Sequence, residues 1–140
     1  MPKLYDLPGA VHSGPPPDDS RPHAYSVAER MYAGAVRAVP QAVVVSGESG
    51  AGKTETNKHL LAYLRWRSGG SGGAEQQAIV ERVTAGITAA NRVLEALGNA
   101  KTQHNDNSSR FGKYLEVYLR ETGVMERASF RCFLLERDCS

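Results

Sequence analysis

The feature that most constrains this chain is the run VVVSGESGAGKTETNKHL, residues 43–60. It opens with β-branched apolar residues, continues with three glycines and a lysine, and closes with a helix-like segment. We therefore expect a buried strand over 41–47, a tight loop and a helix, in that order. A continuous apolar strand followed by a helix is typical of parallel sheets that helices cover on both faces.

The loop satisfies the pattern G-x-x-x-x-G-K-[ST], which is that of a phosphate-binding loop. Its glycines permit backbone conformations in which successive N–H groups surround a phosphate at a helix N-terminus. Lys53 would reach the β- and γ-phosphates, and the Thr54 hydroxyl would bind Mg²⁺. The alternative is a glycine-rich turn with a solvated lysine, but the flanking strand and helix argue against it. The predicted phosphate-binding residues are Gly47, Glu48, Ser49, Gly50, Ala51, Gly52, Lys53 and Thr54.

Apolar residues at helical spacing predict two further helices besides the one expected over 54–67. The first covers 23–39 and stops at Pro40, and the other covers 79–97, with Gly98 placed to end it. Alternating apolar and polar residues predict an antiparallel hairpin over 112–137.

Two segments resist regular structure by their composition. Residues 1–22 are rich in proline and are expected to form an irregular connecting segment. The glycine- and serine-rich stretch at 68–74 is expected to be a flexible surface loop.

Charge, hydropathy and cysteine content limit the partners and the compartment that we expect for this protein. A net charge of +2, with 23% charged residues and no dense block of lysine or arginine, argues against nucleic acid or an anionic membrane as a partner. No apolar run approaches the roughly 20 residues that span a bilayer. Cys132 and Cys139 read most simply as reduced thiols. A cytoplasmic protein is therefore expected.

A second polar segment, NDNSSRFGK at 105–113, lies between a predicted helix and a predicted strand. Its hydroxyls, carboxamides and arginine suit a switch that completes Mg²⁺ coordination, touches the γ-phosphate and pairs with a carboxylate elsewhere. The same composition also describes an ordinary polar surface loop. The residue types alone leave both interpretations open.

The blocks GESGAGKTETNKHLLAYL and NRVLEALGNAKTQHNDNSSRFGKYLEVYL together resemble the myosin motor domain, as its phosphate loop and its switch I. The upstream PHAYSVAERMY is similar to a helix of the same family, so the resemblance covers most of the chain after about residue 21. It implies an α/β fold of the P-loop NTPase type, with a central mixed sheet flanked by helices. Residues 23–140 would form a partial motor domain.

The resemblance also implies roles for individual residues. Asn105 would contact the nucleotide phosphates, and Arg110 would form a salt bridge with a switch II glutamate. Ser108 matches the serine near the γ-phosphate and the attacking water. Tyr5 would lie beside the adenine, although the asparagine and proline of that motif are missing here. The implied catalytic residues are Lys53, Ser108, Ser109 and Arg110, and the implied Mg²⁺ ligands are Thr54 and Ser109.

This sequence departs from the family pattern at several places. Arg92 stands where the family usually has proline, so a continuous helix is possible there. The stretch 68–73 lies where myosins carry a variable surface loop. No D-x-x-G-F-E switch II motif occurs, and family motor domains are several times longer, so we expect a fragment that does not complete the ATPase cycle alone.

The whole protein implied by the resemblance is an actin-activated ATPase that uses ATP and Mg²⁺ to move along actin filaments. Light chains or calmodulin would be further partners, and the location would be the cytoplasmic actin cytoskeleton. One alternative is a nucleotide-binding module that does not hydrolyse ATP. Another phosphate-loop enzyme, such as a kinase, is a weaker alternative because it gives no reason for the segment at 105–113.

Overall fold

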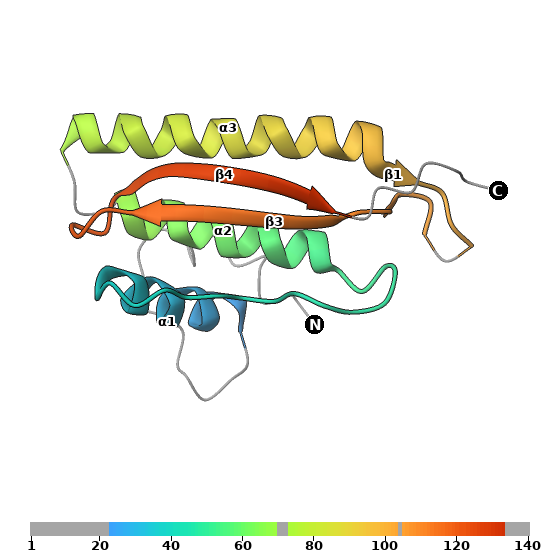
Figure 1. The fold of residues 1–140 in the computed structure, drawn as a ribbon, viewed down its shortest axis with the longest axis horizontal. Helices are drawn as coiled ribbons and strands as arrows, with labels where there is room; N and C mark the ends of the chain where they lie inside the picture. The colour runs from blue at the N-terminus through green and yellow to red at the C-terminus, as the bar shows by residue number, and fades with distance from the viewer. Residues whose placement is uncertain (1–22, 70–72, 104, 134–140) are drawn as a thin grey trace, which may run out of the picture.

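The computed structural model describes residues 23–69, 73–103 and 105–133. Three helices form a layer along one face of a long antiparallel hairpin, and two very short strands follow the third helix (Figure 1). The elements are α1 (Ala24–Val36), α2 (Lys53–Gly69), α3 (Ala74–Gly98), β1 (Asn99–Ala100), β2 (Ser108–Ser109), β3 (Gly112–Leu119) and β4 (Met125–Phe133).

Helix α1 ends at Val36, before the predicted end at residue 39, because a tight turn precedes Pro40. Its N-cap is His23, whose side chain accepts a hydrogen bond from the Tyr25 backbone N–H. At the other end Ala38 has a φ of 59°, in the left-handed region. Its N–H bonds to the Ala35 carbonyl at 2.9 Å, which closes a tight turn.

Helices α2 and α3 are both longer than predicted, and the loop between them is shorter. The prediction of a flexible loop over 68–74 is wrong at both ends, because Ser68, Gly69 and Ala74 are helical. Ser68 is also buried, with 2% of its surface exposed. Residues 70–72 lie outside the described part of the chain. Helix α3 runs without interruption through Arg92, as the missing proline allows.

The strand predicted over 41–47 is not present, which corrects the sequence-based expectation. These residues are neither helical nor paired in a ladder, and Val44 is 88% exposed. A segment of β-forming residues becomes a strand only when a neighbouring strand exchanges backbone hydrogen bonds with it. Within the described ranges β3 and β4 pair with each other, and no strand pairs with this segment.

The hairpin predicted over 112–137 is present as far as residue 133, and residues 134–137 lie outside the described part of the chain. Strands β3 and β4 pair antiparallel, with Leu115 opposite Phe130 and Val117 opposite Ala128. These side chains pack against a core drawn from all three helices, the residue before β4 and the first residue of β4. The buried members of that core are Tyr32, Leu64, Val80, Ile87, Val124 and Met125. Cys132 is a free thiol on β4, whereas Cys139 lies outside the described residues.

A second buried cluster fixes α1 on α2. It consists of Tyr25, Ala28, Leu60 and Tyr63, with Trp66 packed at its side. The Tyr63 hydroxyl donates to the Glu29 carboxylate at 3.0 Å, and the Arg67 Nε donates to the same oxygen at 3.2 Å. Burial, and then the bond to Glu29, raise the pKa of Tyr63. The helix that follows the glycine loop is therefore held firmly by α1.

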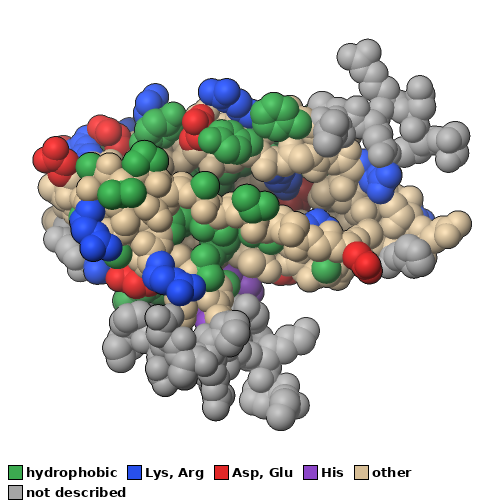
Figure 2. Space-filling view, turned by 60° about the horizontal axis from the view of Figure 1, so that its bottom comes forward, with side chains coloured by type: hydrophobic (Ala, Val, Ile, Leu, Met, Phe, Trp, Pro, Cys, Tyr) green, Lys and Arg blue, Asp and Glu red, His purple; other side chains and the backbone are tan. Residues whose placement is uncertain are grey.

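The surface agrees with the balanced charge of the sequence. On the face shown in Figure 2, basic and acidic side chains are interspersed with apolar ones and do not gather by sign. None of the helices in the described ranges is both long enough and apolar enough to cross a membrane.

Candidate functional site

The glycine loop has the backbone geometry that the pattern predicts. Gly50 and Gly52 have φ values of 83° and 87°, in the left-handed region where a side chain is strained. The loop is exposed and leads directly into α2 at Lys53. The first N–H groups of a helix have no acceptor within it, and Thr56 bonds to the Gly52 carbonyl at 2.9 Å as the helix begins. The loop thus sits at the positive end of the helix dipole.

Lys53 folds back over this loop. Its Nζ donates to the carbonyl oxygens of Gly47 and Glu48, at 2.7 Å in each case. The ammonium group is therefore held at the loop itself, where it can exchange carbonyl oxygens for phosphate oxygens. Backbone donors at a helix N-terminus, an adjacent ammonium group and the Thr54 hydroxyl form a donor set that fits a phosphate chain with its Mg²⁺ ion.

The second polar segment is built around the short β1–β2 ladder. Ser108 pairs with Ala100 and Ser109 with Asn99. Between the two strands the loop is closed by Asn105, whose backbone N–H donates to the Thr102 hydroxyl at 3.1 Å. The Asn105 side-chain oxygen accepts from the Asn107 N–H at 3.0 Å. This segment is thus a structured loop that presents its two serines in an extended conformation.

The two motifs meet at a pair of serine hydroxyls. The Oγ atoms of Ser49 and Ser108, 59 residues apart, lie 3.0 Å from each other. Ser108 is buried, with 6% of its surface exposed, whereas Ser49 lies on the exposed loop. This contact brings the two predicted motifs next to each other in space. The contact supports the switch interpretation of residues 105–113 over that of an ordinary surface loop.

The remaining predicted residues take different positions. Ser109 and Arg110 follow Ser108 and are half-buried, and the Arg110 N–H donates to the Gly98 carbonyl at 2.9 Å. Asn105 is also half-buried, but its side-chain oxygen is engaged within its own loop. Tyr5 and the whole segment 1–22 lie outside the described residues.

Gly98 supports the site in a way that sequence reasoning missed. A Cβ atom at this position would overlap the ring of Phe111, so the glycine lets that ring pack on the end of α3. Lys113 lies over the same ring at 5.2 Å and donates to Asn91 and Glu95 of α3. These contacts fix the C-terminal end of the polar segment to α3. The sequence pattern predicted Gly98 only as a helix end, and no sequence signal indicated its contact with Phe111.

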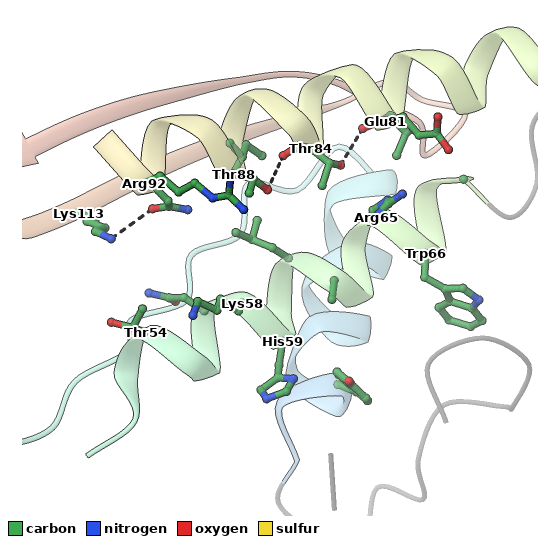
Figure 3. Close-up of a pocket in the computed structure, with 18 of the residues that line it drawn as sticks. Thr54, Lys58, His59, Arg65, Trp66, Glu81, Thr84, Thr88, Arg92 and Lys113 are labelled. Carbon is green, nitrogen blue, oxygen red and sulfur yellow. Dashed lines mark hydrogen bonds between the residues drawn. The ribbon is translucent and has the colours of Figure 1, made fainter. Parts of the chain in front are cut away.

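A groove of about 960 Å³ lies between α2 and α3 (Figure 3). Thr54 and Lys113 line it near the start of α2, and Arg65 and Glu81 line it farther along, with Arg92 on the α3 side. Of the predicted phosphate-loop residues, Thr54 alone lines it. The glycine loop itself is an exposed cradle, and the groove is a separate hollow that opens beside it.

Comparisons with known proteins agree with these observations. The family model for the myosin head (motor domain) matches residues 10–139. The chain is 43% identical to Myosin-6 of Arabidopsis thaliana over 91% of its own length, and 46% identical to Unconventional myosin heavy chain 6 of Caenorhabditis elegans over 83%. It is 38% identical to Unconventional myosin-XIX of Mus musculus over 98%.

The chain spans 8%, 5% and 15% of the lengths of these three relatives. The matches confirm the resemblance found in the sequence and the α/β, P-loop NTPase-type fold class. The chain therefore belongs to the myosin motor-domain family.

Proposed function

We propose that this chain is the ATP-binding portion of a myosin motor, an actin-activated ATPase that converts hydrolysis of Mg²⁺-bound ATP into movement along actin. The observation that carries the proposal is the contact between Ser49 and Ser108, which joins the glycine loop to the polar segment. Neither motif alone separates a motor from other phosphate-loop proteins. A γ-phosphate sensor requires a switch segment close to the phosphate loop, and this contact supports that arrangement.

Binding begins at the glycine loop. Its N–H groups and the N-terminus of α2 would receive the β- and γ-phosphates, and Lys53 would exchange its bonds to Gly47 and Glu48 for bonds to phosphate oxygens. Bound Mg²⁺ neutralises charge on these phosphates, and the hydroxyls of Thr54 and Ser109 would hold it. A Mg²⁺ ion commonly takes one or two protein ligands and completes its shell with phosphate and water.

Hydrolysis would depend on position and charge, with no covalent intermediate. Ser108 and Ser49 already share a hydrogen bond and would orient the attacking water in line with the γ-phosphate. Arg110 would pair with a carboxylate of the motor as the site closes. Loss of the γ-phosphate removes the contacts that hold such a switch, and the resulting movement would pass to the elements attached to it.

The polar segment is continuous with the hairpin, so a movement of the segment would be transmitted to the hairpin. Residues 105–111 lead without interruption into β3, and Lys113 ties the start of that strand to α3. Actin filaments, and light chains or calmodulin, would bind other parts of the motor protein. The proposed location is the cytoplasmic actin cytoskeleton.

Lys53→Ala tests the nucleotide site. Binding of a fluorescent ATP analogue with Mg²⁺ should weaken by about 100-fold, because an ammonium group that contacts phosphate contributes on the order of 3 kcal/mol. Lys58→Ala is the matched control, since Lys58 lies on the same helix, is exposed and pairs with Glu55 at 2.6 Å. Affinity of the Lys53 variant within threefold of wild type would contradict the assignment.

Steady-state ATPase measurements on the complete motor protein test the activity. Turnover with filamentous actin should exceed turnover without it, and Ser109→Ala should slow hydrolysis and raise the Mg²⁺ requirement. Binding of ATP with equal turnover in both conditions would instead support a module that binds nucleotide without motor activity.

A further inference from the structure

His23 is an unusual helix cap because protonation of its ring in mild acid would remove the hydrogen-bond acceptor. The ring Nδ1 accepts the Tyr25 N–H at 3.0 Å, so this nitrogen is unprotonated in the structure. Protonation would turn the acceptor into a donor and place a positive charge at the positive end of the α1 dipole. Serine, threonine and asparagine, which are common caps, do not change charge near neutral pH.

The surroundings of His23 also oppose its charged form. The residue is 8% exposed, and its ring contacts the Tyr25 ring edge-on at 4.7 Å. Tyr25 in turn lies 6.2 Å from His59, the titratable group of α2 that acts on His23. Burial, and then His59, lower the pKa of His23. The ion pair packed in the same helix interface, Glu29 with Arg67, binds Tyr63.

A chain of aromatic contacts connects this cap to the helix that carries the glycine loop. The Tyr25 ring stacks on Tyr63 of α2 at 5.4 Å, and Tyr63 contacts Trp66 at 5.3 Å. Tyr25 and Tyr63 are 4% and 3% exposed, so both lie in the interface between the two helices. Trp66 is the single tryptophan of the chain. Its fluorescence therefore reports on this interface.

We propose that His23 is a proton-sensitive latch between α1 and α2. When neutral, it caps α1 and keeps the first turn of that helix packed on α2. When protonated, it gives up the cap and releases the first turn of α1. The latch concerns the support of the phosphate-loop helix and does not depend on whether nucleotide binds.

The direction of the pH effect follows from the lowered pKa. Because the folded state favours neutral His23, its contribution to stability is complete above the unfolded pKa of about 6.5. The contribution is lost as the pH falls through that value toward the folded pKa. The latch is therefore closed at neutral pH and opens in mild acid.

Urea unfolding of the chain, followed by Trp66 fluorescence at about pH 7.5 and about pH 5.5, tests the latch. The folded-to-unfolded ratio of the wild type should fall from the higher to the lower pH, and loss of the cap should contribute roughly a fivefold part of that fall. His23→Asn keeps an acceptor that does not titrate, so the fall in its folded-to-unfolded ratio should be smaller by a factor of about five. His23→Ala should be less stable at the higher pH and should also lack that part of the response.

An equal pH response in wild type and His23→Asn would overturn the proposal. Should the variants fail to fold, magnetic resonance of the wild-type chain provides an independent test. Protection of the Tyr25 amide should disappear with the same midpoint as the titration of the His23 ring. A titrating ring beside a Tyr25 amide that keeps its protection would equally overturn the latch.

Discussion

Tyr32→Phe removes one buried hydroxyl that links distant parts of the chain. The Tyr32 Oη donates to the Gly123 carbonyl at 3.1 Å across 91 residues, and it joins α1 to the turn between β3 and β4. Tyr32 is 7% exposed, and burial raises the pKa of its phenol, which stays a neutral donor at neutral pH. Arg67 lies 4.8 Å from the ring centre, a contact that phenylalanine retains.

The expected cost comes from the carbonyl that remains. Gly123 is buried, so its oxygen loses a donor in a place where water does not easily replace it. A buried polar group left without its partner costs about 1–3 kcal/mol. Since the ring and its packing persist, we expect about 1.5 kcal/mol, or roughly a tenfold fall in the folded-to-unfolded ratio.

Urea unfolding at neutral pH measures this cost. The midpoint should fall with an unchanged slope, because the surface exposed on unfolding stays the same. Tyr114→Phe is the matched control, since Tyr114 is 51% exposed, and its effect should stay within about 0.5 kcal/mol. The reasoning fails if Tyr32→Phe changes stability no more than Tyr114→Phe does.

Three further predictions concern the site and its support. Gly98→Ala should lower the free energy of unfolding by about 1–3 kcal/mol through overpacking, measured by thermal unfolding. Gly86→Ala in the same helix has open space around it and should stabilise the protein by up to about 1 kcal/mol. Equal effects of the two substitutions would contradict the packing argument. A double-mutant cycle with Ser49→Ala and Ser108→Ala should give a coupling of about 0.5–1.5 kcal/mol in urea unfolding, and strictly additive losses would show that the hydroxyl contact contributes nothing. The raised pKa of Tyr63 favours its neutral form in the fold, so its contribution is present below about pH 10 and is lost as the pH rises above that value. Tyr63→Phe should therefore flatten the decline of melting temperature in alkali, and an unchanged decline would count against this assignment.

Local features of the sequence were enough to predict the loop and the helix that follows it. Glycines at 50 and 52 are needed because each residue adopts a left-handed conformation, which is a property of the residue itself. The helical period of α3, with Arg92 in place of proline, likewise predicted an unbroken helix. The alternation in β3 and β4 predicted a hairpin because consecutive strands find each other across a short turn.

The tertiary structure decided the features that depend on distant partners. The run at 41–47 has the composition of a buried strand, yet it pairs with no strand among the described residues, because a strand needs a neighbour that its own residues do not specify. The contact between Ser49 and Ser108 and the packing of Phe111 on Gly98 arise from how α2, α3 and the hairpin lie together. Sequence alone thus predicted which residues would bind a phosphate, because backbone conformation and charge are local properties. Only packing decided that Ser108 reaches that loop, because such a contact depends on the whole arrangement of helices and strands.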